Sequence, residues 1–149
     1  MIAIASDHAG YPLKQVIIEH LTAENVAFKD FGTDSEASCD YAIFAQRACN
    51  AVVSGECERA ILCCGTGVGI SIAANKVHGI RCVCCSDPYS AAMGRRHNDA
   101  NALAMGARVV GTELGLMIVD SFLGASFEGE RHARRVGQIM AIERGESLE

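Results

Sequence analysis

Short apolar runs alternate along the chain with longer segments whose apolar residues recur at helical spacing. The apolar runs predict strands over residues 2–6, 26–31, 59–64, 80–85 and 101–105. The amphipathic segments predict helices over residues 10–21, 41–54, 70–76, 88–96, 113–123 and about 130–144. The strand runs are nearly continuous in apolar residues, as expected when helices cover both faces of a parallel sheet. The pattern therefore predicts one α/β domain over residues 1–149, a Rossmann-like three-layer α/β/α sandwich with a five-stranded parallel sheet.

The last predicted helix, about residues 130–144, has no strand to which the chain could cross back. Such a helix either lies against its own domain or reaches a neighbouring subunit. It carries Arg131 and Arg135, which are four apart and share one helix face. The two guanidinium groups could clamp a phosphate. On composition alone, a solvated face that pairs with Glu128 and Glu130 is the better interpretation.

In open α/β sheets, ligands bind beyond the carboxyl ends of the strands, where the direction of chain winding reverses. Asp7 and His8 follow the first predicted strand, residues 64–69 follow the third, and His97 and Asn98 precede the fifth. We expect these three segments to meet at one edge of the sheet. Asp7 could instead cap the helix that follows it, and the His97 segment taken alone is typical of a solvated turn.

The third strand runs directly into Cys64-Gly65-Thr66-Gly67-Val68-Gly69, in which every second residue from position 65 is glycine. Glycines let backbone N–H groups converge on an anion, and the N-terminus of the following helix adds a positive end. A dinucleotide-binding fingerprint would require glycine at the position of Ile70, and the Gly-Lys-Ser/Thr of a Walker loop is absent. Glycines that only pack a tight turn are the alternative. Three of them exceed what one turn requires, so we favour anion binding.

Composition narrows the classes of function. Half of the 149 residues are hydrophobic, and the formal net charge is −5, which argues against a general binder of nucleic acid or anionic membranes. No segment approaches the roughly 18 consecutive apolar residues that span a bilayer, and the N-terminus lacks a signal-peptide pattern. We therefore expect a cytoplasmic protein whose eight cysteines are free thiols rather than a disulfide framework.

Free cysteine packs as a small apolar residue, so each thiol is expected to be structural unless its setting argues otherwise. Cys64 is the exception, because it stands at the mouth of the glycine loop, where a helix N-terminus and N–H donors favour the thiolate. Cys63 should face the opposite side of the sheet. Cys82 and Cys85, three apart in a strand, also face opposite ways and lack the further ligands of a zinc site. The sequence predicts no metal site.

Five motifs together resemble one family. They are Ser-Asp-His-Ala-Gly at 6–10, Cys-Gly-Thr-Gly-Val-Gly-Ile-Ser-Ile-Ala-Ala-Asn-Lys at 64–76, Arg-His-Asn-Asp-Ala-Asn at 96–101, Gly-Ala-Arg-Val-Val-Gly at 106–111 and Arg-His-x-x-Arg at 131–135. With these motifs in this order, essentially the whole chain resembles the type B ribose-5-phosphate isomerases, a family that also contains allose-6-phosphate and galactose-6-phosphate isomerases. The resemblance implies a five-stranded parallel sandwich and a dimer or tetramer whose active sites are shared between two subunits. We expect neither a metal nor another cofactor.

The resemblance also implies a role for each candidate residue. Cys64 would remove the proton from the carbon next to the carbonyl, and Thr66 would help to relay a proton between the two substrate oxygens. Asp7 and His97 would open the furanose ring. The enediolate would be held by the backbone N–H groups of the loop at Gly65, Gly67, Val68 and Gly69. The remaining candidates would bind substrate: Asn98 a sugar hydroxyl, Tyr41 the sugar, and His8, Arg108, Arg131 and Arg135 the phosphate.

In this family the residues from His97 onward would be supplied by the neighbouring chain, which would explain the lone final helix. Some relatives use a glutamate elsewhere as the base, but Cys64 places this chain in the cysteine-base group. The family often has proline after the residue that matches Tyr41, whereas this chain has Ala42.

The residues alone support the same chemistry. Removing a proton next to a carbonyl requires a base near the carbon and donors where negative charge develops, and a thiolate beside a glycine-rich turn supplies both. We therefore predict the interconversion of ribose 5-phosphate and ribulose 5-phosphate through an enediolate.

Three alternatives to this reaction are open at the level of the sequence. The first is the same reaction on allose or galactose 6-phosphate. The second is a non-catalytic module that binds a phosphosugar or a nucleotide, a common use of this architecture. The third is a thiol redox enzyme or a phosphatase. It would need a resolving cysteine beside Cys64, from which Cys63 faces away, or an arginine six residues on, where Ile70 stands.

Overall fold

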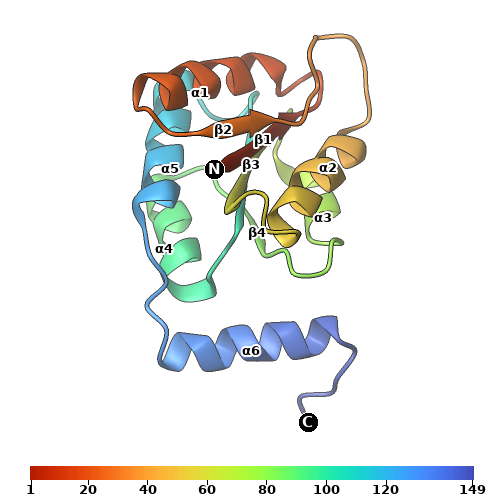
Figure 1. Cartoon of the computed structure of the whole chain (residues 1–149), viewed down its shortest axis with the longest axis vertical. Coiled ribbons are helices and arrows are strands. Elements are labelled where there is room, and N and C mark those ends of the chain that lie inside the picture. Colours follow the sequence, from red (N-terminus) through yellow and green to blue (C-terminus); the bar gives the residue numbers. More distant parts are fainter.

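Five parallel strands form a single sheet in the computed structural model, which describes residues 1–149 (Figure 1). The strands are β1 (Ile2–Ser6), β2 (Phe28–Asp30), β3 (Arg59–Cys64), β4 (Cys82–Cys84) and β5 (Ala102–Gly106). Their order across the sheet is β2-β1-β3-β5-β4, and every neighbouring pair is parallel. The chain steps outward from β1 to β2 and then crosses to β3 on the other side of β1. The winding therefore reverses between β1 and β3, which is where sheets of this kind bind ligands.

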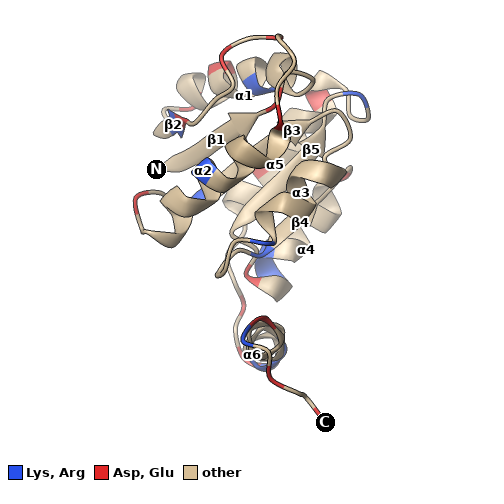
Figure 2. Ribbon diagram, turned by 90° about the vertical axis from the view of Figure 1, so that its right-hand side faces the viewer, with Lys and Arg blue, Asp and Glu red and all other residues tan.

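Helices cover both faces of the sheet. α1 (Tyr11–Ala23), α4 (Pro88–Asn98) and α5 (Thr112–Gly124) pack on one face, and α2 (Tyr41–Val53) and α3 (Val68–Ala74) pack on the other. α6 (Arg131–Glu143) lies apart from both layers, beyond the amino ends of the strands (Figures 1 and 2). The predicted three-layer sandwich with five parallel strands is confirmed.

None of the helices combines the length and the apolar character that crossing a membrane requires. The cytoplasmic location stays a prediction.

Each face of the sheet has its own apolar core, because alternate residues of a strand point to opposite faces. Ile4, Ile61 and Leu103 are fully buried beneath α1, α4 and α5, whereas Ala5 and Ala104 are fully buried beneath α2 and α3. Strands β1 and β5 contain no charged residue, and every residue in them is buried (Figure 2). Their continuous apolar runs in the sequence therefore follow from their place in the middle layer.

Six of the eight cysteines lie in or against the two cores, whereas Cys39 and Cys84 belong to neither. Cys63 lies in the core under α1 and Cys64 in the core under α2, so their opposite orientation is confirmed. Cys82 and Cys85 also lie on opposite faces, and all eight cysteines are free. Burial raises the pKa of Cys49 to about 12. That thiol therefore stays protonated at neutral pH and packs as an apolar group.

The two edge strands are shorter than predicted. β2 covers Phe28–Asp30 instead of 26–31, and β4 covers Cys82–Cys84 instead of 80–85. Each pairs with a neighbour on one side only. The apolar residues that flank each of these strands therefore do not pair with the neighbouring strand. Ile80, for example, donates its N–H to the carbonyl of Val77 at 3.1 Å and belongs to a turn.

A buried lysine links α1 to the loop that leads to α2. Lys14 has no exposed surface, and its Nζ donates to both carboxylate oxygens of Asp30 at 2.7 Å and to the carbonyl of Thr33. A buried ammonium group needs such partners, because its removal from water is costly. The contact fixes the start of loop 32–40 against α1.

Replacing Asp30 by alanine is expected to lower the free energy of unfolding by about 3 kcal/mol, because Lys14 then stays buried without its counter-charge. The value is at the low end for buried pairs, since the Asp30 side chain is 35% exposed. Urea unfolding at a fixed protein concentration measures the change. The exposed Asp34 lies four residues further on, in loop 32–40, and Asp34→Ala should change the free energy of unfolding by less than about 0.5 kcal/mol. Equal unfolding midpoints for the two variants would show that the ion pair contributes nothing.

Candidate active site

A hollow of about 490 Å³ opens beyond the carboxyl ends of β1 and β3. It lies where the winding of the chain reverses, which is the place predicted for a site. Four segments line it: the end of β1, the loop before α2, the glycine loop after β3, and the turn after β5. The predicted site residues in its lining are Asp7, His8, Tyr41, Cys64, Gly65, Thr66, Gly69 and Arg108.

Cys64 is the last residue of β3, borders the hollow, and is 4% exposed. Its Sγ accepts the backbone N–H of Gly67 at 3.1 Å. Gly67 directs this N–H at the sulfur from a backbone with φ of 80°, which glycine adopts without steric cost. A donor aimed at sulfur stabilises negative charge there, as a thiolate base requires. Residues three apart in the sequence thus form both the candidate base and its donor.

Two predicted residues of the glycine loop do not line the hollow. The N–H of Gly67 donates to Cys64, and the N–H of Val68 donates to Thr66 Oγ1 at 3.2 Å. Both donors are therefore used inside the loop. The backbone that borders the hollow belongs to Gly65, Thr66 and Gly69. An anion in the hollow would meet these three positions and not the whole loop.

Arg108 reaches the hollow from the turn after β5. Its N–H donates to the carbonyl of Gly65 at 3.0 Å, and the N–H of Ala107 donates to the carbonyl of Cys64 at 2.8 Å. These bonds continue the pairing of β3 with β5 beyond the strand ends. The expectation that a neighbouring chain supplies Arg108 is wrong, because this turn places the guanidinium group at the hollow of its own chain.

Asp7 and His8 enter the hollow from the end of β1. Asp7 Oδ1 accepts the N–H of Gly10 at 2.9 Å, so the carboxylate also caps the turn into α1, as the alternative interpretation predicts. His8 Nδ1 accepts the N–H of Cys39 at 3.2 Å. A neutral His8 therefore carries its proton on Nε2 and can donate a hydrogen bond from that atom.

The other predicted residues lie away from this hollow; they are His97, Asn98, Arg131 and Arg135. A helix that joins two parallel strands returns the chain to the amino edge of the sheet, so the end of α4 lies there. The carbonyl of Asn98 accepts the Nε–H of Arg81 at 3.1 Å, directly before β4 begins. The prediction that His97 and Cys64 meet at one edge of the same sheet is therefore wrong within a single chain.

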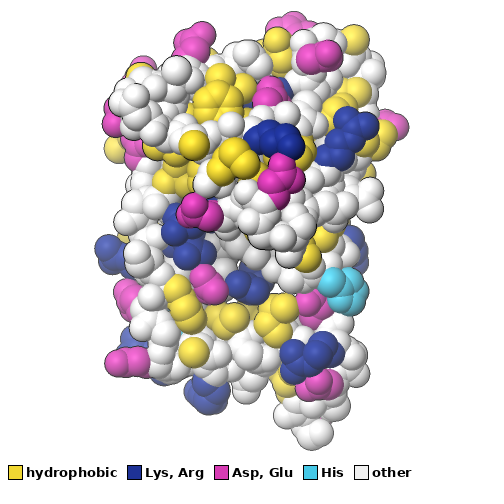
Figure 3. All heavy atoms as spheres, in the orientation of Figure 1, with side chains coloured by type: hydrophobic (Ala, Val, Ile, Leu, Met, Phe, Trp, Pro, Cys, Tyr) yellow, Lys and Arg dark blue, Asp and Glu magenta, His cyan; other side chains and the backbone are white.

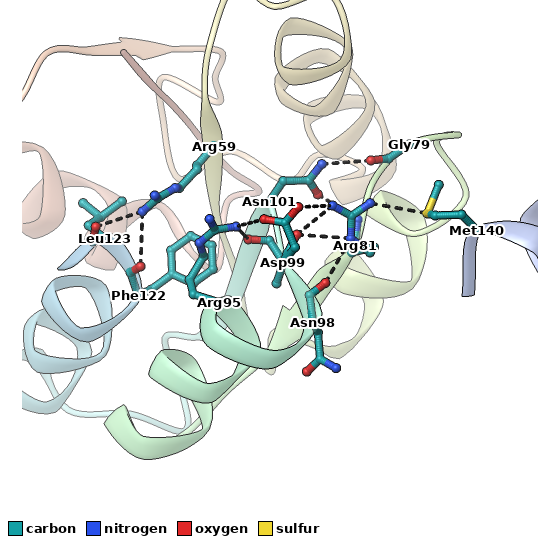
Figure 4. A network of polar contacts seen from close by, with 11 residues as sticks. Arg59, Gly79, Arg81, Arg95, Asn98, Asp99, Asn101, Phe122, Leu123 and Met140 are labelled. Carbon is teal, nitrogen blue, oxygen red and sulfur yellow. Dashed lines mark hydrogen bonds and ion pairs between the residues drawn. The ribbon is translucent and has the colours of Figure 1, made fainter. Parts of the chain in front are cut away.

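A network of guanidinium groups fixes the end of α4 (Figure 4). Arg95 is buried, and its Nη1 donates to Asp99 Oδ1 at 2.9 Å. Arg81 donates from Nη2 to Asp99 Oδ2 at 3.2 Å and from Nη1 to the sulfur of Met140 at 3.3 Å. The network ties the end of α4, which carries His97, to the start of β4 and to α6.

His97, Glu128 and His132 offer ligand atoms that lie within 4.8 Å of one another. The two imidazole rings are stacked, with centroids 4.3 Å apart and an angle of 8° between their planes. An imidazole nitrogen binds a metal ion with a lone pair that lies in the ring plane. Two nearly parallel planes at this spacing do not meet at one ion, so the observed arrangement does not suit a shared metal.

The protein is expected to lose stability through His132 as the pH falls below about 6.5, the value of an unfolded histidine. Burial is the main cause that lowers the pKa of His132, followed by the positive charge of a protonated His97. The native state then binds fewer protons than the unfolded chain, so this stabilisation is present above the unfolded pKa and is lost as the pH falls through the native one.

Thermal unfolding between about pH 7.5 and 5.5 measures this effect. His132→Phe keeps an aromatic ring but cannot titrate, so its Tm should fall less over the same interval. An equal fall in both proteins would show that the titration of His132 does not contribute.

The sequence prediction missed part of the lining. Ser38, Cys39 and Asp40 border the hollow from the loop before α2, and their position directly before Tyr41 was the available signal. Cys84, also missed, does not line the hollow but lies against the glycine loop, where its Sγ would be 3.0 Å from a Cβ atom built on Gly67. Its place at the carboxyl end of β4 was the signal, because all strand ends of this kind lie at one edge.

Comparisons with known proteins show the family to which the chain belongs. A family profile described as Ribose/Galactose Isomerase matches residues 2–139. The chain is 55% identical over 142 residues to ribose-5-phosphate isomerase B of Escherichia coli strain K12, with 95% of each chain covered. It is also similar to the solved structure of ribose-5-phosphate isomerase B from Clostridium thermocellum, with a TM-score of 0.95, 54% identity and 97% of each chain covered. A ribose-5-phosphate isomerase B from Mycoplasma genitalium, solved with bound ribulose-5-phosphate, gives a TM-score of 0.91 at 41% identity, covering 96% of this chain and 95% of that one.

Proposed function

Because the chain belongs to the ribose/galactose isomerase family, we propose that it is an aldose–ketose isomerase that interconverts ribose 5-phosphate and ribulose 5-phosphate. The observation that carries the proposal is the sulfur of Cys64, which borders the hollow and accepts the N–H of Gly67 at 3.1 Å. The names of the similar proteins favour the pentose phosphate over a hexose phosphate, and one of those proteins was solved with bound ribulose-5-phosphate.

The reaction is a transfer of protons within one substrate. The Cys64 thiolate removes the proton from C2 of the open-chain aldose, and the electron pair of that C–H bond becomes the C1–C2 double bond of an enediolate. Negative charge develops on O1, beside the backbone that borders the hollow at Gly65, Thr66 and Gly69. A proton moves from O2 to O1 with help from the Thr66 hydroxyl. The Cys64 thiol then returns its proton to C1, which forms the ketose and restores the thiolate.

The remaining groups of the hollow suit the sugar and the phosphate. Tyr41 lies against the glycine loop, where its ring would be 2.9 Å from a Cβ atom built on Gly69, so it forms the wall of the sugar site. His8 offers its Nε2–H, and Arg108 offers a guanidinium group. Both are donors that fit phosphate oxygens.

A second copy of the chain would complete the site. Ring opening requires a second group that carries a proton, and the phosphate requires a further positive charge. His97 and Arg131 would supply them, but both lie at the opposite edge of the sheet in their own chain. We therefore assign a dimer or tetramer with shared sites. The exposed apolar residues of α6 support this, because Ile139 and Ile142 line a groove of about 560 Å³ between α6 and the amino edge of the sheet. Figure 3 shows apolar side chains along α6 where it faces the rest of the molecule.

Incubation with ribose 5-phosphate in D2O, followed by NMR, tests the reaction. With a chelator present, we expect ribulose 5-phosphate to form and deuterium to enter C2 of the aldose and C1 of the ketose. Turnover of allose or galactose 6-phosphate in place of ribose 5-phosphate would contradict the pentose substrate but not the isomerase. If none of the three sugar phosphates were converted, the result would contradict the proposal and favour a non-catalytic binding module.

Mixing two inactive variants tests the shared site. Cys64→Ala and His97→Ala should each be nearly inactive as pure proteins. In a mixed dimer, one of the two sites combines the intact Cys64 of one chain with the intact His97 of the other, and the second site carries both substitutions. Random mixing by unfolding and refolding together should therefore restore about a quarter of the wild-type sites. Mixed protein as inactive as the pure variants would show that each site is built within one chain.

A further inference from the structure

The rings of His97 and His132 form a stacked pair, of which the proposed mechanism uses only His97. Their centroids are 4.3 Å apart and their planes differ by 8°. His97 lies in the last turn of α4 and His132 in the first turn of α6. The two helices approach each other at the lower left of Figure 1. His132 is therefore the direct neighbour of the proposed ring-opening residue.

The two histidines differ in burial. His132 is 6% exposed, whereas the side chain of His97 is 38% exposed. The Nε2 atom of His132 has no hydrogen-bond partner. Such an atom costs free energy, and it is rare enough in native proteins to require an explanation. Phenylalanine could stack in the same place without that cost, so packing alone does not account for a histidine.

Glu128 is the acidic group that faces both rings. Its Oε2 lies 3.5 Å from Nε2 of His132 and 4.0 Å from Nε2 of His97. The backbone N–H of Glu128 donates to the carbonyl of Arg96 at 3.0 Å, which ties the carboxylate to α4 beside His97. The other charged groups that face His132 are Arg131 and Arg135. Burial lowers the pKa of His132, which favours a neutral ring in the stack.

We propose that His132 is a positioning residue for ring opening: its buried ring, held beside Glu128, fixes the plane of the His97 imidazole. The inference rests on the proposed function of His97. Ring opening breaks the C1–O4 bond of the furanose, forms the C1 carbonyl, and moves a proton from O1 to O4. The imidazole must therefore face two substrate oxygens, and a misplacement of about 1 Å can cost about 100-fold in rate. A ring held by its face keeps its nitrogen edge free for that transfer.

Two rates measured on His132 variants test this role. Conversion of ribose 5-phosphate requires ring opening, whereas exchange of deuterium from D2O into C1 of ribulose 5-phosphate, an open-chain sugar, requires only Cys64. His132→Ala should lower the conversion about 10- to 100-fold and leave the exchange within about twofold. His132→Phe restores the stack and should recover most of the conversion rate.

A loss of exchange as large as the loss of conversion in His132→Ala would overturn the inference, because a general structural defect would then explain both. Unchanged conversion in His132→Ala would overturn it too, as would a failure of His132→Phe to recover. Exchange by the wild-type protein separates the two proposals. Its absence there would overturn the proposed function itself, whereas its presence with a proportional loss in His132→Ala overturns only the role of His132.

Discussion

Replacing Cys64 by serine is expected to lower kcat for ribose 5-phosphate by about 1,000-fold, within the range that a positioned general base contributes. A serine hydroxyl occupies the same place and accepts the same N–H of Gly67, but it is not ionised at neutral pH. The hollow keeps its shape while the base is lost. A spectrophotometric assay of ketose formation measures kcat, and deuterium entry into C1 of ribulose 5-phosphate measures proton transfer directly. Both rates should fall together, and KM should change little.

Cys84→Ser is the matched control, because Cys84 lies against the same loop but does not line the hollow. Burial raises the pKa of its thiol, which makes it a poor source of thiolate at neutral pH. We expect this variant to keep nearly the full kcat. If Cys84→Ser instead of Cys64→Ser abolished the exchange, Cys84 would be the base. If neither variant did, the proton would be moved by a group other than these two thiols.

The part of the site that could be predicted from the sequence is local. β3 ends at Cys64, and the loop 65–69 follows at once, so the candidate base, its donor and the bordering backbone come from six consecutive residues. The end of an apolar run and the glycines that follow it can both be recognised directly in the sequence. The sandwich could be predicted for a similar reason, since the buried strands β1 and β5 are nearly continuous in apolar residues and contain no charge.

The rest of the site depends on which edge of the sheet a residue reaches. Arg108 follows a strand directly and therefore stays at the carboxyl edge, next to Cys64. His97 ends a helix that has carried the chain back to the amino edge. Proximity to a strand in the sequence does not distinguish these cases, and the prediction erred on His97 for that reason. The wrong expectation for Arg108 came instead from the family resemblance, which assigned every residue from His97 onward to the neighbouring chain. The hydrophobic pattern also did not predict the lengths of β2 and β4. Both are edge strands, and their flanking residues form hydrogen bonds in turns instead of pairing with the neighbouring strand.

Replacing Gly67 by alanine is expected to lower kcat/KM about 100-fold, because it removes a single donor aimed at the reacting group. A Cβ atom at this position would lie 2.8 Å from the carbonyl carbon of Met105 and 3.0 Å from the nitrogen of Gly106. Both are backbone atoms at the end of β5, which is buried in the middle layer. The loop must therefore move away from β5, and the N–H of Gly67 then leaves the sulfur of Cys64. Steady-state kinetics and the deuterium exchange measure the loss.

Gly55→Ala separates this effect from the strain of the backbone itself. Gly55 has φ of 82°, close to the value at Gly67, but no atom lies within 4 Å of a Cβ atom built there. Alanine at Gly55 should cost about 1–2 kcal/mol of stability for its left-handed conformation and leave kcat/KM unchanged. Alanine at Gly67 should add a loss of activity and a larger loss of stability, because its Cβ also meets the backbone of β5. If Gly67→Ala were destabilised at least as much as Gly55→Ala but kept its activity, the N–H at Cys64 would have no part in proton transfer, and the base would depend on the thiol alone.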